Sequence, residues 1–427
     1  MLHDVVMDAK FTREERSWIA YDWANSAYSI IITTALFALF YQQLVTPERY
    51  VSTWGFTQGI GSIVVAILAP FLGTFADFRG YKKPLFTVFF LLGIASTASM
   101  FFLRGAAWYV AMAVYTASAI GFSGANVFYD SFLIDVTTHQ RMHRVSANGF
   151  SWGYIGSVIP FVISLAIVWF WETIGLPTLE SAYRISFVIT ALWWGVFALP
   201  LLRNVRQNHG VEPTAQPLRD TWKRFTATLK KIRSSYRPIF MFLTAYFFYI
   251  EGVNAIIRNA TPIARDMGFD IALLTVVLLV LQIVAWPFAL LYGWAAKRIG
   301  ARPMIFGGIL TYVVVVAIAF FLPVIPQSIR NGMFWVLAML IGSAQGGVQA
   351  LSRSYFGRMI PADAAAEFFG FYNIVGRFSS FIGSFLIALT TRLTGQSRYG
   401  ILSLLALFLI GGILLTRVPK DRDSVPA

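Results

Sequence analysis

The chain has no cysteine and only four histidines among its 427 residues. Without cysteine there can be no disulfide, cysteine-ligated metal or thiol chemistry, and no histidine stands at zinc-ligand spacing from a second plausible ligand. A Walker-type phosphate loop and a Ser-His-Asp arrangement are also missing from the sequence. We therefore expect no metal, no cofactor, no direct drive by ATP and no enzymatic activity.

Charged residues are scarce as well, at 13% of the chain, whereas 57% of the residues are hydrophobic and 16% aromatic. One soluble core could not bury so much apolar surface, so most of it must face lipid. A helix needs about 20 apolar residues to cross ~30 Å of hydrocarbon, and lipid leaves an unclosed backbone no alternative to the helix. The sequence predicts an all-α membrane protein with twelve transmembrane helices, at 17–44, 51–76, 84–104, 107–135, 147–171, 184–203, 237–258, 269–296, 302–323, 331–352, 367–391 and 398–416.

Basic residues are distributed unevenly between the two sides of these spans. If the N-terminus is cytoplasmic, 25 of the 34 lysines and arginines lie on the cytoplasmic side, eight lie outside, and Arg377 lies within a span. By the positive-inside rule, we expect both termini in the cytoplasm. Anionic lipid headgroups then explain the net charge of +14, which in a soluble protein could indicate nucleic-acid binding.

The two halves of the chain repeat each other. Two glycine-bracketed basic loops, at 73–85 and 293–303, each separate two apolar runs, and Asn126 and Asp130 recur as Gln345 and Gln349 at an offset near 220. These repeats predict two six-helix bundles, at 17–203 and 237–417, flanked by cytoplasmic segments at 1–16 and 418–427. The central segment, 204–236, has apolar residues at helical spacing among basic ones, which predicts a cytoplasmic amphipathic linker on the lipid headgroups.

Several segments resemble a known family. The loop at 73–85 resembles the signature loop of the major facilitator superfamily. The segments YDWANS (21–26), SANGFSWGYIG (146–156), AYFFYIEGV (245–253), QGGVQALSRSYF (345–356) and EFFGFY (367–372) are similar to its vacuole-effluxer-like branch, which includes the fungal autophagy-related amino-acid effluxer and many bacterial members. This resemblance implies the major facilitator fold, two six-helix pseudo-repeats with a substrate site between them near the bilayer midplane.

Two departures from the family pattern bear on function and location. Glu251 stands where we expect the family to have Asp, which moves the carboxylate by one methylene. Fungal members carry longer soluble additions, so the compactness of this chain favours a prokaryotic plasma membrane. We expect a monomer whose partners are the lipid bilayer, a small-molecule substrate and, if transport is coupled, protons, with no nucleic acid.

Ionisable groups inside the hydrocarbon are costly and therefore indicate function. Counted at 1.5 Å per residue from the inner end, Glu251 lies ~21 Å deep in the seventh span and Arg377 ~15 Å deep in the eleventh. We predict that Arg377 binds a substrate carboxylate and that Glu251 exchanges protons. The alternative is that the two side chains only neutralise each other.

Other polar residues of the spans form two further groups of candidates. Asp22 and Asp130, each ~8 Å from the cytoplasmic end, are predicted to take part in proton coupling, with structural pairing to basic residues as an equal alternative. Amide side chains are predicted to bind the substrate, although Gln345 and Gln349 could instead join helices. The predicted substrate-binding set is Asn25, Asn254, Gln345, Gln349, Asn373 and Arg377.

The loop after the second span is predicted to act in conformational change rather than in substrate binding. An Asp at a helix end can latch a neighbouring helix in the outward-open state. The second loop has Lys297 in place of that Asp, so we expect a one-sided latch. The predicted gate residues are Gly73, Asp77, Arg79, Gly80, Lys82, Asp135 and Arg353.

These observations together predict a secondary transporter that moves a small polar solute, in the first place amino acids, by alternating access. Transport follows from the topology and the repeats, whereas amino acids follow from the family resemblance. Efflux of amphipathic drugs or other metabolites is the alternative, although the mid-membrane Glu251, Arg377 and amides favour a polar solute. A non-transporting sensor is a remote alternative, because the longest loop, of ~35 residues, is far below the size of a domain.

Overall fold

The computed structural model describes residues 10–46, 53, 64–65, 68–231, 235–266, 269 and 271–419. Within these residues every regular element is helical, and the one extended pairing is a bridge between Phe78 and Val211. Ten helices of the described chain are long and apolar enough to cross a membrane, and Ile382–Thr394 forms a shorter apolar helical stretch. The predicted second span, 51–76, lies largely outside the described residues.

The first half of the chain forms one helical bundle, which we call the N-half. Its first span is built from three consecutive segments, α2 (Arg13–Tyr28), η1 (Ser29–Ala35) and α3 (Leu36–Leu44). The other elements of the N-half are a helix at 68–76, α5 (Lys82–Ser99), η2 (Met100–Phe102), α6 (Trp108–Ser131), α7 (Leu133–Val136), α8 (Met142–Trp169) and α9 (Leu179–Asn204).

The first span begins with a cap and changes its hydrogen-bond pattern halfway. Thr12 caps α2, since its hydroxyl accepts from the Glu15 N–H at 3.1 Å while the Glu15 carboxylate accepts from the Thr12 N–H at 2.9 Å. This is a capping box, which satisfies two backbone donors reciprocally. The segment Ser29–Ala35 is a π-helix, a wider turn that is common at functional sites.

The second half of the chain forms a corresponding bundle, the C-half, joined to the first by α10 (Pro217–Lys231). Its α11 is continuous over 30 residues, from Arg237 to Asp266. The remaining elements are α12 (Ile271–Ile299), α13 (Ala301–Phe321), η3 (Leu322–Val324), α14 (Gln327–Met359), η4 (Ala362–Ala364), α15 (Ala365–Thr394) and α16 (Ser397–Leu415).

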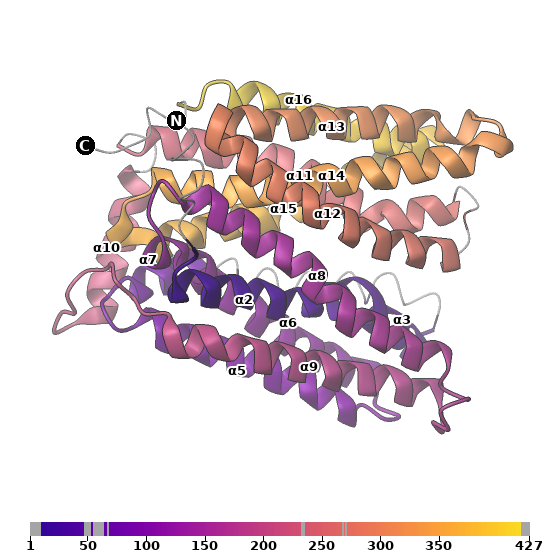
Figure 1. Ribbon diagram of the computed structural model, residues 1–427, viewed down its shortest axis with the longest axis horizontal. Helices are drawn as coiled ribbons and strands as arrows, with labels where there is room; N and C mark the ends of the chain where they lie inside the picture. The colour runs from indigo at the N-terminus through magenta and orange to yellow at the C-terminus, as the bar shows by residue number, and fades with distance from the viewer. Residues whose placement is uncertain are drawn as a thin grey trace.

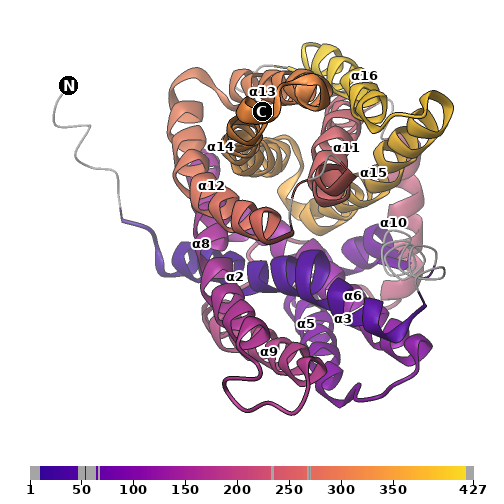
Figure 2. The same cartoon turned by 90° about the vertical axis from the view of Figure 1, so that its right-hand side faces the viewer.

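The two halves lie side by side with their helices roughly parallel. Figure 1 shows the purple helices of the N-half below and the orange and yellow helices of the C-half above, and the end-on view in Figure 2 separates the same two groups. Contacts between the halves run mainly from α8 to α12 and α14, and from α6 to α15. Any opening between the halves must therefore separate these helix pairs.

The linker helix α10 lies across one end of the bundle (Figure 1). Trp222 of α10 contacts Phe71 of the N-half, with ring centroids 6.2 Å apart, and Phe225 stacks on Phe371 of the C-half at 6.1 Å. The segment predicted as the linker thus contains a helix whose described aromatic side chains contact both halves, and its place on the lipid headgroups stays a prediction. Below, the end that carries α10, residues 77–81 and residues 203–211 is called the basic end.

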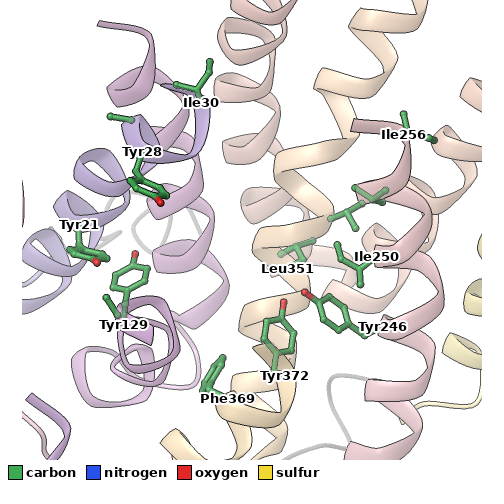
Figure 3. Packing of buried hydrophobic residues seen from close by; sticks show 14 of the residues in the cluster. Tyr21, Tyr28, Ile30, Tyr129, Tyr246, Ile250, Ile256, Leu351, Phe369 and Tyr372 are labelled. Carbon is green, nitrogen blue, oxygen red and sulfur yellow. The ribbon is translucent and has the colours of Figure 1, made fainter. Parts of the chain in front are cut away.

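Aromatic side chains fill much of the core in each half. In the N-half, Tyr21 lies 4.6 Å from Tyr129, and in the C-half Tyr246 stacks on Tyr372 at 4.3 Å (ring centroids; Figure 3). Rings pack large apolar areas in few rotamers and attract each other through their edges and faces. These pairs join helices that are distant in sequence, and so hold each bundle together as a unit.

The observed helices differ from the predicted spans mainly at their ends. The span predicted at 331–352 is part of a helix that runs from Gln327 to Met359, and the one predicted at 237–258 continues to Asp266. Hydropathy locates only the part of a helix that matches the hydrocarbon, whereas the helix itself continues through polar residues into the headgroup region. For this reason these two helices are longer than their predicted spans.

Candidate functional site

Asp77 joins the N-half to the C-half at the basic end. Its two carboxylate oxygens accept hydrogen bonds from the backbone N–H groups of Ala366 and Glu367, each at 2.9 Å. These donors belong to the first turn of α15, where N–H groups have no partner within the helix and the helix dipole favours negative charge. The side chain is only 1% exposed, so the carboxylate forms a buried latch on the C-half.

Two other predicted gate residues of this loop, Arg79 and Gly80, contact the linker. Arg79 pairs with Glu212 at 2.7 Å, and the Gly80 N–H donates to the Gln207 side chain at 3.0 Å. Gly80 has φ of 87°, a left-handed conformation that a side chain would disfavour. The loop and the first residues of the linker therefore form one hydrogen-bonded unit at the basic end.

Lys82 and Asp135 form a buried ion pair inside this unit. The Lys82 ammonium lies 2.7 Å from Asp135 Oδ2, and both side chains have no exposed surface. Asp135 Oδ1 also accepts from the backbone N–H groups of Asn208 and His209, each at 2.8 Å. The Gly210 N–H then donates to Asp363 of the C-half at 3.2 Å. Asp135 thus holds the first residues of the linker, and the linker in turn contacts the C-half through Gly210.

The latch predicts a pH dependence for closure of the basic end. Burial raises the pKa of Asp77 to about 7; Lys82 and the two N–H donors oppose this rise, and Glu367 adds to it. When the halves separate, Asp77 becomes hydrated and its pKa returns toward ordinary values, so closure takes up a proton. The stabilisation of the closed end that comes from protonation of Asp77 is therefore fully present below the ordinary pKa of an aspartate, and it is lost as pH rises through about 7.

A cysteine reporter can measure this dependence, because the chain has no cysteine of its own. Ser354 is fully buried between the halves, and Ser354→Cys is nearly isosteric. We expect its labelling by a water-soluble maleimide, corrected for thiolate content, to increase from pH 5 to pH 8. Asp77→Asn keeps one acceptor oxygen, should weaken closure by about 1–3 kcal/mol and should remove the pH dependence. An unchanged pH profile in this variant would refute the assignment.

Arg353 makes the second connection between the halves. Its guanidinium extends from α14 into the N-half, where Nη2 donates to Asp22 at 2.9 Å and Nη1 to Asp130 at 3.3 Å. Nε donates to the Ser146 hydroxyl at 3.0 Å. All three ionisable side chains are buried, and Arg353 is 3% exposed. One buried guanidinium is therefore shared by two carboxylates.

Aromatic rings surround the same guanidinium. Its central carbon lies 4.3 Å from the ring centroid of Phe150, 4.5 Å from that of Trp18 and 5.5 Å from that of Tyr129. Cations bind to the faces of such rings, most strongly where water is excluded. The Arg353 cage, as we call it, consists of six N-half side chains: Trp18, Asp22, Tyr129, Asp130, Ser146 and Phe150.

Further hydrogen bonds join α8 to the C-half. The His143 ring lies 2.8 Å from the Ser354 hydroxyl, and the Ser146 hydroxyl donates to the Ala350 carbonyl at 2.8 Å. Farther along α8, the Ser151 hydroxyl donates to the Trp286 carbonyl at 3.0 Å. Together with the contacts of Asp77 and Arg353, these hydrogen bonds join the described parts of the two halves mainly toward the basic end, which is closed.

The predicted amides lie in different surroundings. Asn25 donates to Asn126 at 2.7 Å within the N-half, and Asn254 donates to the Gly376 carbonyl at 3.3 Å within the C-half. Asn373 connects the halves, since its amide donates to Asp130 at 3.1 Å. The amide groups of all three asparagines thus form partly buried hydrogen bonds.

The two predicted glutamines lie on α14, one turn apart. Gln345 lies near the Tyr154 phenol of the N-half, and Gln349 is half-buried one turn closer to Arg353. Tyr154 also packs directly on Gly346, where an added Cβ would lie 2.6 Å from the ring. The structure therefore brings Gln345 to the interface between the halves, next to the Arg353 cage in the direction away from the basic end.

Glu251 is fully buried in the C-half. Its carboxylate accepts a hydrogen bond from the Gly383 N–H of α15, and an added Cβ at Gly383 would lie 2.7 Å from Glu251 Oε1. The glycine thus lets α15 approach the carboxylate closely. The Arg377 side chain lies outside the described residues, so its predicted roles, as carboxylate ligand or partner of Glu251, stay predictions.

Three functional candidates escaped the sequence analysis. Arg258, the last residue of the span predicted at 237–258, lies within electrostatic reach of Glu251 and has an exposed side chain. The spacing of seven residues along α11, two helical turns, could have shown that both lie on one face. Trp18 and Phe150, whose rings hold the guanidinium, lie one turn from Asp22 and Ser146 respectively, but aromatic residues are too common in spans for that spacing to be informative.

Comparison with known proteins agrees with this architecture. A family model described as "Vacuole effluxer Atg22 like" matches residues 47–140 and 134–427. The MFS-type transporter YxiO of Bacillus subtilis (strain 168) is 45% identical over 424 residues, which cover 98% of this chain and 97% of YxiO. Autophagy-related protein 22-2 of Aspergillus clavatus is 26% identical over 278 residues, covering 60% of this chain and 44% of the fungal protein.

Solved structures have the same fold at low identity. The proton:xylose symporter XylE superposes with a TM-score of 0.72 at 11% identity, covering 96% of each chain. A bacterial homologue of the iron transporter ferroportin, in an outward-facing state, superposes with a TM-score of 0.68 at 13% identity, covering 95% of this chain and 99% of the other. These comparisons confirm the all-helical major facilitator fold and the resemblance stated above. The chain belongs to the Atg22-like vacuole effluxer family and is an integral membrane transporter of the major facilitator superfamily.

Proposed function

We propose that the transporter moves small polar solutes, in the first place amino acids, by alternating access between the N-half and the C-half. The observation that carries this proposal is the direct bond from Asn373 of the C-half to Asp130 of the N-half, beside the glutamine Gln345 at the same interface. A solute with hydrogen-bonding groups can replace such contacts between the halves, whereas an apolar solute would leave the buried polar groups without partners.

In this proposal the basic end faces the cytoplasm of a prokaryotic cell, in agreement with the positive-inside rule. The Asp77 latch and the Arg353 cage then close the cytoplasmic side, which makes the described conformation outward-facing. Opening breaks both contacts and forms others at the opposite end. The proposal includes both directions of transport, and the family description favours export.

Reconstituted liposomes test the substrate class. Purified protein should catalyse counterflow of a radiolabelled amino acid, with a rate above that of protein-free liposomes. Asn373→Ala should reduce the rate, because it removes a predicted substrate ligand and a contact between the halves. The matched control is Asn259→Ala in α11, whose amide bonds within the C-half only, to Ala255 and Ser384. No flux with a complete panel of amino acids would overturn the proposal.

Efflux of an amphipathic drug is the second candidate, and one observation favours it. The C-half contains a cavity of about 110 Å³ whose lining is entirely apolar, including Ile256, Val315, Phe334 and Leu404. Such a cavity suits an apolar group and offers no polar ligand. Liposome flux of lipophilic cations without amino-acid flux would make this the better assignment.

Coupling to protons is assigned to Glu251, because this carboxylate is fully buried within the C-half, where it accepts a hydrogen bond from the Gly383 N–H, and ionisable groups inside the hydrocarbon are costly unless they have a function. A Glu251→Gln change keeps the shape and removes the titration. We expect accumulation driven by a pH gradient to fall to the level of gradient-free exchange, while exchange itself continues. The surface change Glu212→Gln serves as the matched control, since Glu212 is an exposed carboxylate that pairs with the exposed Arg79. Full pH-driven accumulation in Glu251→Gln would exclude the assignment.

A further inference from the structure

The Arg353 cage has a property that a simple gate does not require. All six of its side chains belong to the N-half, from α2, α6 and α8, whereas the guanidinium that fills it belongs to the C-half. When the halves separate at the basic end, the cage stays together and its occupant leaves. The N-half alone therefore presents a complete binding site for a positively charged group.

The walls of this site are fixed independently of Arg353. Trp18 stacks on Tyr129 with ring centroids 4.6 Å apart and an interplanar angle of 16°, and the Trp18 indole N–H donates to the Tyr129 carbonyl at 2.9 Å. Gly149 leaves space for the occupant, since an added Cβ would lie 3.0 Å from Arg353 Nη2 and still closer to Asp22. Preformed walls reduce the entropy that a ligand loses on binding.

The negative charge of the cage without Arg353 favours binding of another positively charged group. Asp22 and Asp130 both contact one guanidinium, so their carboxylates lie close together on neighbouring helices. Separation of the halves admits water to these carboxylates, but two negative charges so close together still repel each other and attract a positive partner. A proton or a cationic ligand can supply that charge. The three rings favour the cationic ligand, because a flat cation can stack against the ring faces, whereas a proton bound to a carboxylate gains no such contact.

We propose that the Arg353 cage is a binding site for the cationic group, guanidinium or ammonium, of an amino-acid substrate that enters from the open basic end, with Arg353 as its built-in competitor. The statement that this ligand is a transported substrate rests on the proposed function, but binding of a ligand to the cage can be tested without transport. The guanidinium of L-arginine matches the present occupant in charge, shape and hydrogen-bond donors. Binding and closure then exclude each other, so the ligand must leave the cage before the basic end can close.

The test compares ligand affinities in purified full-length protein by calorimetry, with L-arginine and the uncharged L-glutamine as probes. Removing the competitor by Arg353→Ala should tighten L-arginine binding about tenfold or more, because the empty cage is then available in every molecule. L-Glutamine should show no such gain. Adding Asp22→Asn to Arg353→Ala should cancel it. The matched control, Arg219→Gln, removes an exposed arginine of α10 that donates a hydrogen bond to Gln216, and it should behave as wild type.

Arg353→Lys covers the case in which the alanine variant fails to fold, since it keeps the charge and loses the planar fork; L-arginine should bind it more tightly than wild type. Equal gains for both probes, or no gain in either variant, would overturn the proposal and leave the proton as the counter-charge. Amino-acid flux in liposomes without any such gain would refute the cage and retain the proposed function. An Asp22-dependent gain without flux would support the cage and refute the transport of amino acids.

Discussion

Replacing Arg353 by alanine is expected to open the basic end almost completely. The change leaves Asp22 and Asp130 buried without the guanidinium that both contact at 2.9 and 3.3 Å. Removal of one partner from a buried ion pair typically costs 3–5 kcal/mol, roughly the penalty of the charge left behind. Only the closed conformation suffers this cost, because separation of the halves hydrates the carboxylates. A change of about 3 kcal/mol shifts a two-state equilibrium by more than about 100-fold.

The Ser354→Cys reporter measures the shift as an increase in maleimide labelling from the basic side. A second change identifies its cause. Neutralising both carboxylates, by Asp22→Asn and Asp130→Asn together with Arg353→Ala, removes the buried charge and should restore most of the protection. The control Arg219→Gln should leave labelling unchanged. If Arg353→Ala kept the reporter fully protected, the ion pairs would not hold the basic end closed, and the other contacts between the halves would suffice.

The fold was open to prediction because lipid leaves the backbone few choices. An apolar stretch of sufficient length has to be a helix, so the helical class and the succession of spans followed from hydropathy. The repeat of polar residues at an offset near 220 gave the division into two halves. What hydropathy could not give was the π-helix at Ser29–Ala35, since the pattern of apolar residues is nearly the same for both kinds of turn.

The candidate site was open to prediction only in part. A charged residue inside a span draws attention by its cost, which is how Asp22, Asp130 and Glu251 became candidates. Their partners could not be derived in the same way. Asp22 and Arg353 are 331 residues apart, and pairing over such a distance depends on helix packing, which composition does not encode. The sequence also gave no reason to connect Asp77 with the first turn of α15, since backbone N–H groups are the same for every residue there.

A second large effect is expected where two glycines let the halves touch. An added Cβ at Gly73 would collide with the backbone carbonyl of Ala366, and one at Gly370 would lie 2.7 Å from the Ala69 carbonyl oxygen. In both cases the obstacle is backbone, which cannot turn aside as a side chain can. A leucine at Gly73 therefore prevents α15 from reaching the Asp77 latch. Overpacking costs about 1–3 kcal/mol or more. This cost falls on the closed conformation, because the two backbones are apart in the open one.

We expect Gly73→Leu to expose the Ser354→Cys reporter at the basic end and to slow transport, because the cycle includes the closed conformation. Gly307→Leu is the matched control, since nothing lies within 4 Å of a Cβ at that position, and labelling should stay at the wild-type level. Gly73→Leu differs from Arg353→Ala in one respect: it blocks closure by volume and not by charge, so neutralising Asp22 and Asp130 should leave it open. Protection of the reporter in Gly73→Leu would mean that the halves can close without contact between these backbones, and the latch would then lose its structural basis.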